Sequence, residues 1–256
     1  MKVLALYSIK GGVGKTAAAV NLAHAAAADG RRTLLLDLDP QGAASFYFRV
    51  RPRKGAGKGV LLGSGRKAER AIRATDYPGL DILPAHRSFR KLELALDAVK
   101  KPRSRLSRLL EPQRDQYDLV VIDCAPTLTL VAESVLRAAD LVAVPVVPTT
   151  LSERTLLMLR DFAGEHGLRS SALLGFFSLM DRRKTLHRQL AEDLPRRAGV
   201  RFCRTRIPVS SDIEKMGLHR EPVACQAPHS PGAAAVQELW WELRPELWPE
   251  SATGGA

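Results

Sequence analysis

The 256-residue sequence has only three cysteines and no long apolar run. Cys124, Cys203 and Cys225 are odd in number and lack the spacing of metal ligands, which indicates reduced thiols in a reducing compartment. No apolar run approaches the ~20 residues that span a bilayer. The run Met1–Tyr7 is too short for a signal peptide and leads directly into a glycine-rich motif. The cytoplasm is therefore the expected location.

Acidic residues are also scarce, because 39 basic residues face 27 acidic ones and give a formal charge of +12. Such a surface attracts polyanions, namely nucleic acid, anionic lipid or an acidic partner, although a solubility bias would give the same balance. Residues 49–67 contain seven basic residues, five glycines and no acid. We interpret 49–67 as a flexible, basic, glycine-rich surface loop. The tail 249–256 is expected to be disordered.

Short apolar runs alternate with helical patterns along the chain. We predict strands at Lys2–Tyr7, Thr33–Leu38, Asp81–Leu83, Leu119–Ile122, Leu141–Val144, Ala172–Met180 and Arg206–Val209. We predict helices at Lys15–Asp29, Arg87–Val99, Ser104–Leu110, Leu151–His166, Arg182–Arg197 (broken by Pro195) and Gly232–Leu243. Apolar strands separated by helices indicate an α/β fold with a mostly parallel, twisted sheet and helices on both faces. Without a repeat or a linker, residues 1–248 are expected to form a single domain.

The segment Lys10–Thr16 (Lys-Gly-Gly-Val-Gly-Lys-Thr) lies between a predicted strand and a predicted helix. Its glycines let several N–H groups point at one anion, and the helix N-terminus adds partial positive charge. Lys15 can reach the β- and γ-phosphates of ATP, and the Thr16 hydroxyl can bind Mg²⁺. The alternative is a glycine-rich turn that binds no nucleotide. The predicted nucleotide contacts of the loop are Lys10, Gly11, Gly12, Val13, Gly14, Lys15, Thr16 and Ala17.

Carboxylates follow two of the predicted strands. Asp37 and Asp39 close the second strand, and Asp123 closes the apolar run that begins at Asp118. Side chains at the carboxyl ends of parallel strands project into the crevice where α/β proteins bind ligands. Asp123 is expected to hold Mg²⁺, through water because this ion keeps much of its hydration shell.

Together, the segments Lys10–Thr16, Asp37–Gly42 and Asp118–Pro126 resemble the ParA/MinD group of deviant Walker-A P-loop ATPases. Ile9 stands where the standard P-loop has glycine, and Lys10 is the extra lysine of the deviant form. The ParA side is closer, because Asp-Pro-Gln-Gly after the second strand is typical of ParA proteins.

The resemblance extends from Met1 to about Pro222, through Val144–Thr155 and through Ile207-Pro208 followed by a short helix. There are two departures. Ala17 replaces a second threonine that often contacts the α-phosphate, and Ala125 replaces the first proline of a Cys-Pro-Pro switch.

The resemblance implies a mechanism. ATP closes two subunits face to face as a homodimer, and Lys10 crosses the interface to the partner's phosphates. Asp39 orients the attacking water, because phosphoryl transfer depends on positioning and charge stabilisation; an ordinary strand-end or capping aspartate is the alternative. Asp37 supports Lys15 or the metal shell. The adenine is held near Met180-Asp181 and Ile207-Pro208, unless these residues only pack in the core.

ParA-like proteins bind DNA without sequence specificity as ATP dimers. No aromatic residues are interleaved with the basic residues of the matching C-terminal region, which indicates contacts to phosphates alone. The resemblance also implies nucleoid association and an activating adaptor of the ParB kind, whereas the cargo, plasmid, chromosome or protein complex, stays open. The candidate DNA contacts are Arg182, Arg183, Lys184, Arg188, Arg204, Arg206, Lys215 and Arg220.

Two other classes stay open. A MinD-like ATPase would bind the membrane through a basic amphipathic C-terminal helix. Residues 237–246 contain more acid than base and are interrupted by Pro245, so we expect no membrane binding. A metabolic or metal-cluster-carrying P-loop enzyme would share the fold, and Cys124 is the one candidate for a cluster ligand.

Overall fold

The computed structural model describes residues 1–63, 65–167 and 172–249, and its β-strands form a single sheet. The strand order is β3-β4-β2-β5-β1-β6-β7-β8, and every neighbouring pair is parallel except β3–β4. The predicted fold class is thereby confirmed. The strands are β1 (Lys2–Leu6), β2 (Thr33–Asp37), β3 (Arg73–Ala74), β4 (Leu80–Leu83), β5 (Leu119–Asp123), β6 (Leu141–Val146), β7 (Leu173–Met180) and β8 (Arg201–Pro208).

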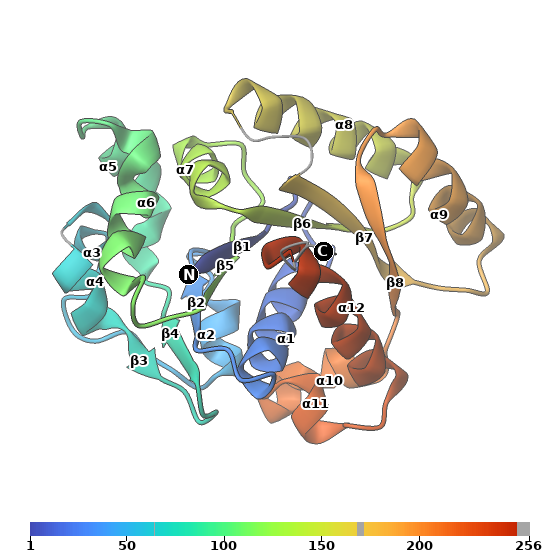
Figure 1. Cartoon of the computed structure of the whole chain (residues 1–256), viewed down its shortest axis with the longest axis horizontal. Helices are drawn as coiled ribbons and strands as arrows, with labels where there is room; N and C mark the ends of the chain where they lie inside the picture. The colour runs from blue at the N-terminus through green and yellow to red at the C-terminus, as the bar shows by residue number, and fades with distance from the viewer. Residues whose placement is uncertain (64, 168–171, 250–256) are drawn as a thin grey trace, which may run out of the picture.

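Helices cover both faces of this sheet (Figure 1). The α-helices are α1 (Lys15–Ala28), α2 (Ala43–Tyr47), α3 (Gly59–Leu62), α4 (Gly65–Ala71), α5 (Leu92–Asp97), α6 (Arg105–Leu110), α7 (Leu130–Ala138), α8 (Thr150–Glu165), α9 (Thr185–Arg197), α10 (Ser211–His219), α11 (Val223–Gln226) and α12 (Pro231–Leu247). Short 3₁₀ helices are η1 (Arg87–Lys91), η2 (Pro102–Ser104) and η3 (Glu111–Gln113).

The central strands are apolar because both of their faces are covered. Every residue of β2 and β5 is buried. Successive side chains of a strand point to opposite faces, so Leu34 and Leu36 belong to one core and Leu35 to the other. The first core packs helices α3 to α9 against the sheet, and the second packs α1, α2, α10, α11 and α12. The burial pattern thus follows directly from the unbroken apolar runs in the sequence.

Strand register brings the acidic strand ends together. Asp123 of β5 is paired with Leu6 of β1 on one side and with Asp37 of β2 on the other. The glycine-rich loop leaves β1 at this same edge and enters α1. The topology therefore collects the loop and the two carboxylates at the carboxyl ends of three adjacent strands.

Several sequence expectations were wrong in detail. The segment 49–67 is not irregular throughout, because Val60 and Leu61 bury their side chains and α3 forms around them. Neither Pro195 nor Pro245 breaks its helix: α9 and α12 continue past them. The last strand is longer than predicted, and 87–99 divides into η1 and α5. The tail prediction, apart from Pro249, lies outside the described residues.

Among the described residues, each helix falls short of the length and apolar character needed to cross a membrane.

Candidate nucleotide-binding site

The loop between β1 and α1 has a backbone that requires glycine at two positions. Gly12 and Gly14 adopt the left-handed conformation, with φ values of 70° and 84°. A Cβ atom on Gly14 would also meet Ser178 Oγ at 2.9 Å. Gly14 precedes α1 without any side-chain cap, which leaves the first N–H groups of the helix available to an anion.

Lys15 lies in the first turn of α1, with its side chain folded back over the loop. The residue is 7% exposed, and its Nζ donates a hydrogen bond to the carbonyl oxygen of Lys10 at 3.3 Å. Burial lowers the pKa of Lys15, while the negative charges of Asp123 and Asp39 act in the opposite direction. The ammonium group is thus held between the loop and the acidic strand ends, where it can meet a phosphate.

Asp123 is fully buried, and neither of its carboxylate oxygens has a hydrogen-bond partner among the described residues. Burial and the neighbouring charge of Asp37 raise its pKa to about 8, against the opposing effects of the Thr16 hydroxyl and the Lys15 ammonium. The Thr16 hydroxyl lies near the carboxylate but outside the geometry of a hydrogen bond to either oxygen. Burying a carboxylate without a partner costs folding free energy unless a bound ligand or cation pairs with it.

Asp37 is also fully buried, and helix α2 holds one of its oxygens. Oδ2 accepts hydrogen bonds from the backbone N–H of Ser45 at 2.8 Å and from its hydroxyl at 2.6 Å. Oδ1 has no partner. Burial raises the pKa of Asp37 to about 6, against the effect of the Ser45 hydrogen bonds. Asp37 and Asp123 together offer three unpartnered oxygens, and oxygen is the ligand that Mg²⁺ prefers.

Asp39 and Lys10 lie at the rim of this site. Asp39 is half-buried, and its Oδ1 accepts a hydrogen bond from the Gln41 N–H at 2.9 Å. The Lys10 side chain points away from its own loop, because its Nζ donates to Thr149 Oγ1 at 3.3 Å, beside the start of α8. Lys15 thus bonds to its own loop, whereas Lys10 reaches the start of α8.

A cavity of about 490 Å³ continues from the loop along α1. Gly14, Ala17, Ile207 and Pro208, four of the predicted nucleotide contacts, line it. Met180 and Asp181 do not. Met180 is buried in the core on the other face, and the carboxylate of Asp181 accepts hydrogen bonds from Arg183.

Sequence reasoning missed most of the cavity wall. Asn21, Ser178, Ser210 and Glu214 line it, and none of them belongs to a motif. Asn21 is fixed by three hydrogen bonds, since its Nδ2 donates to the Ala17 carbonyl and to Met216 Sδ, and its Oδ1 accepts from Val223 N–H. The sequence feature that came closest to predicting this wall was Ile207-Pro208, which ends β8 shortly before α10 begins at Ser211.

Comparisons with known proteins agree with this geometry. The family described as "AAA domain" matches residues 1–163. "Chromosome partitioning protein ParA" of Caulobacter vibrioides is 32% identical over 251 residues, which cover 95% of this chain and 94% of that protein. The chain belongs to the ParA/MinD-type P-loop ATPases.

Two solved structures share the fold of this ParA/MinD-type chain. Cobyrinic acid a,c-diamide synthase from Mycobacterium smegmatis, with bound ADP and magnesium, is 27% identical with a TM-score of 0.79, and covers 96% of this chain and 94% of that one. The cell division ATPase MinD of Pyrococcus furiosus is 23% identical with a TM-score of 0.76, and covers 95% and 98% respectively.

The candidate DNA contacts of this ParA/MinD-type chain fall into two groups. Arg204 and Arg206 alternate along the edge strand β8, beside Arg182 and Lys184 in the turn before α9. The side chains of these four residues have no hydrogen-bond or ion-pair partner in the described part of the chain. The other four have partners: Arg183 binds Asp181, Arg188 donates to the Arg182 carbonyl, Lys215 pairs with Asp212, and Arg220 contacts α2.

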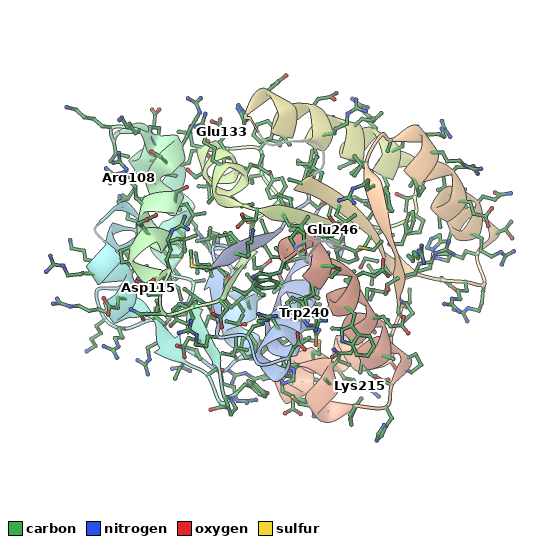
Figure 2. All side chains as sticks on the ribbon, viewed as in Figure 1. Arg108, Asp115, Glu133, Lys215, Trp240 and Glu246 are labelled. Atoms are coloured by element: carbon green, nitrogen blue, oxygen red, sulfur yellow. The ribbon has the colours of Figure 1, made fainter. Side chains whose placement is uncertain are left out.

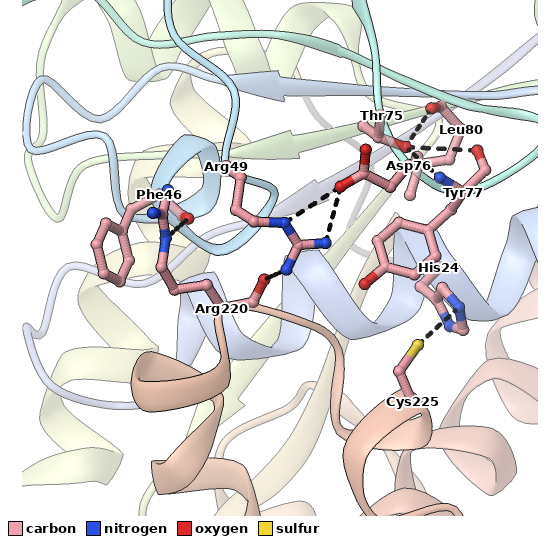
Figure 3. A network of polar contacts seen from close by, with 9 residues as sticks. All are labelled: His24, Phe46, Arg49, Thr75, Asp76, Tyr77, Leu80, Arg220 and Cys225. Atoms are coloured by element: carbon pink, nitrogen blue, oxygen red, sulfur yellow. Dashed lines mark hydrogen bonds and ion pairs between the residues drawn. The ribbon is translucent and has the colours of Figure 1, made fainter.

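Arg220 joins α10 to α2 rather than facing solvent freely (Figure 3). Its Nε donates to the Phe46 carbonyl at 3.0 Å, and its guanidinium lies 4.5 Å from the centre of the Phe46 ring. Arg49 donates to the Arg220 carbonyl and pairs with Asp76 at 2.8 Å. The structure therefore places Arg220 in a contact between helices, where the sequence had suggested a DNA contact.

Proposed function

We propose that this ParA/MinD-type chain binds ATP with Mg²⁺ at the glycine-rich loop, hydrolyses it, and in the ATP-bound form makes a homodimer that binds DNA without sequence specificity. The observation that carries the proposal is the pair of buried carboxylates beside Lys15. Asp37 and Asp123 bury three oxygens that have no hydrogen-bond partner among the described residues, and the Mg²⁺ ion of a bound magnesium–nucleotide complex would supply the missing positive charge. The adjacent left-handed glycines fit a phosphate chain.

Mg²⁺, when bound, would neutralise charge on the β- and γ-phosphate oxygens. Thr16 and Asp123 are the residues proposed to hold it. Asp37, which is held in place by the Ser45 hydroxyl, is proposed to support the water molecules around the ion. The backbone from Lys10 to Ala17 is proposed to hold the phosphates, and Ile207 with Pro208 to border the base. Binding of Mg-ATP, measured by calorimetry with wild-type protein and Lys15→Ala, tests this assignment.

Three side chains divide the work of hydrolysis in this proposal. Lys15 stabilises the transferring phosphoryl group from inside the loop, and Asp39 orients the attacking water. Lys10 acts in the partner's site, and its Nζ is bonded to Thr149 rather than to an atom of its own loop. Lys10→Ala should keep measurable ATP binding but remain monomeric on a sizing column with ATP, and a stable dimer of that variant would refute the role.

The DNA contact is proposed at Arg182, Lys184, Arg204 and Arg206, whose side chains have no hydrogen-bond or ion-pair partner in the described part of the chain. The Caulobacter relative is named a chromosome partitioning protein, and on that basis we propose that this chain positions a DNA or other cargo on the nucleoid, with an adaptor protein that stimulates hydrolysis. A gel-shift assay with DNA of unrelated sequence, with and without ATP, tests the binding step.

MinD-like membrane binding receives no support from α12. Trp240, Leu243 and Leu247 bury its apolar face in the core, and Glu242 accepts hydrogen bonds from the backbone N–H groups of Arg204 and Thr205 on β8. A metal-cluster role receives none either, because Cys124, its one candidate ligand, is buried in the core and not on a surface that two subunits could share. Liposome flotation and visible absorbance after anaerobic purification are the corresponding checks.

A further inference from the structure

The basic segment 49–67 borders a second open pocket, which the proposed function does not use. The pocket has a volume of about 680 Å³ and lies between this segment and α4. Four cationic side chains line it: Arg53 and Lys54 from the segment's start, Lys67 and Arg70 from α4. None of its lining residues is acidic.

These four cations are not neutralised within the molecule. All four residues are exposed, and in the described ranges none of their side chains has a hydrogen-bond or ion-pair partner. Lys67 and Arg70 are three residues apart on α4, where like charges destabilise a helix slightly. An anion in the pocket would relieve that repulsion and would meet four donors at once.

The floor of the pocket is rigid and apolar. Val60 and Ala71 are 6% and 4% exposed, and they join the core that packs α3 and α4 against the sheet. Arg105 holds the end of α3 by donating to the Leu62 carbonyl at 3.2 Å. A Cβ atom on Gly59 would meet no atom within 4 Å, so the backbone there is open to a ligand. Two of the four cations, Lys67 and Arg70, are therefore carried by a helix that packs on the core.

The location of the pocket is as informative as its charge. Helices α3 and α4 lie at the β3 end of the sheet, whereas Arg204 and Arg206 lie on β8 at the other end (Figure 1). Nitrogen-tipped side chains extend outward around α3 and α4 (Figure 2). The two basic regions are thus separate, and the pocket is not an extension of the contact already proposed.

We propose that this pocket holds a backbone phosphate of a DNA duplex, as a second DNA contact at the β3 end of the molecule. Exposed cations without an aromatic side chain suit phosphate rather than bases. The basic surface continues beyond the pocket to Arg51, Lys58 and Arg66, so it suits an extended polyanion better than a single small phosphate. Within described residues 49–71 no large apolar side chain is exposed, which disfavours a membrane.

The inference rests on the proposed DNA binding, and a pair of matched double variants separates the two. Lys54→Gln with Lys67→Gln removes two charges from inside the pocket. Lys100→Gln with Lys101→Gln removes two exposed charges outside both the pocket and the basic segment. Affinity for a duplex of unrelated sequence is measured by fluorescence anisotropy with ATP and Mg²⁺ across about 50 to 200 mM salt.

The pocket variant should bind more weakly, and its slope of log affinity against log salt should fall by about one, because one phosphate contact is lost. The control should lose less than half as much of that slope. Gly59→Asp places a carboxylate over the pocket without removing a cation, and it should weaken binding in the same way. Melting curves check that each variant is folded.

Equal losses in the two double variants would overturn the pocket assignment in favour of net charge alone. Unchanged binding by the pocket variants, with a loss in Arg204→Gln/Arg206→Gln, would overturn the inference and leave the proposed function intact. Absence of any DNA binding by the wild type would defeat both. Pocket-dependent binding to vesicles of anionic lipid, without any effect on DNA, would also overturn the inference.

Discussion

The nucleotide site and the exposed basic residues of the surface differ in how their charged groups are solvated. In the site a few charged groups are buried, and Asp37 and Asp123 have unpartnered oxygens whose desolvation raises both pKa values. On the surface many cations are exposed to water, and each contributes little by itself. The effect of a substitution in the site therefore depends on where the residue lies. The effect of a substitution on the surface depends on how many cations are removed and on the salt concentration.

The largest expected effect belongs to Asp39→Ala, at the edge of the buried site. Turnover should fall by about 100-fold, because the proposed orientation of the attacking water is lost. ATP binding and the ATP-dependent dimer should persist. Phosphate release measures the first, and sizing chromatography the second. Asp115→Ala, at an exposed aspartate outside the site, is the control, and wild-type turnover in Asp39→Ala would end its catalytic assignment.

A smaller loss is expected for Arg204→Gln with Arg206→Gln on the surface. DNA affinity should fall by about tenfold, and the salt slope by about two, because two phosphate contacts are removed. Turnover of ATP without DNA should not change. Lys100→Gln with Lys101→Gln, which are exposed and remove the same charge elsewhere, form the control. Binding that does not respond to salt in the wild type would contradict the electrostatic account.

Asp123→Asn should stabilise the protein in the absence of magnesium and nucleotide. The folded-state pKa of Asp123 is about 8, above the ordinary 3.8. Stability from this group is complete below about pH 4 and is lost as pH rises through 8, because the unfolded chain ionises first. Asparagine does not titrate, so its advantage should grow between these limits.

At pH 8 the expected gain for Asp123→Asn is about 1 to 2 kcal/mol, or about 4 °C in Tm. Melting curves at pH 5 and pH 8 measure it. Asp118→Asn removes a carboxylate that pairs with Arg32 on the exposed surface and should give no gain. A lower Tm for Asp123→Asn at pH 8 would contradict the proposed cost of the buried charge.

The smallest effect is expected for Arg220→Ala, which separates a structural arginine from the DNA-binding ones. Its contacts to Phe46 should be lost at a cost of about 1 kcal/mol in the free energy of unfolding. DNA affinity and its salt slope should stay within about twofold of wild type. Anisotropy and denaturant titration measure the two quantities. A slope reduced by about one would return Arg220 to the DNA surface.

The sequence was most informative where a motif is continuous. Lys10–Thr16 predicted the loop, and the acids after the apolar runs of β2 and β5 predicted the carboxylates that strand register brings together. Unbroken apolar strands predicted the parallel sheet because only burial on both faces explains them. Each of these features is formed by residues that are adjacent in the sequence, so it can be recognised from the sequence alone.

The sequence was least informative where contacts between distant segments decide. Glycine-rich 49–67 contains α3 because Val60 and Leu61 pack on the core, which overrides local propensity. Pro245 stays inside α12 since Leu243 and Leu247 are buried on either side of it. Arg220 meets Phe46 from 174 positions away, and the cavity wall combines α1, β7, α10 and α12. Contacts between residues so far apart in the sequence leave no local pattern from which they could be predicted.

Calorimetric titration of the purified protein with ATP and magnesium tests the central claim most directly. The account predicts a heat of binding with one nucleotide per chain, lost in Lys15→Ala and weakened when magnesium is omitted. Absence of heat from the folded wild-type protein, or unchanged binding by Lys15→Ala, would contradict it.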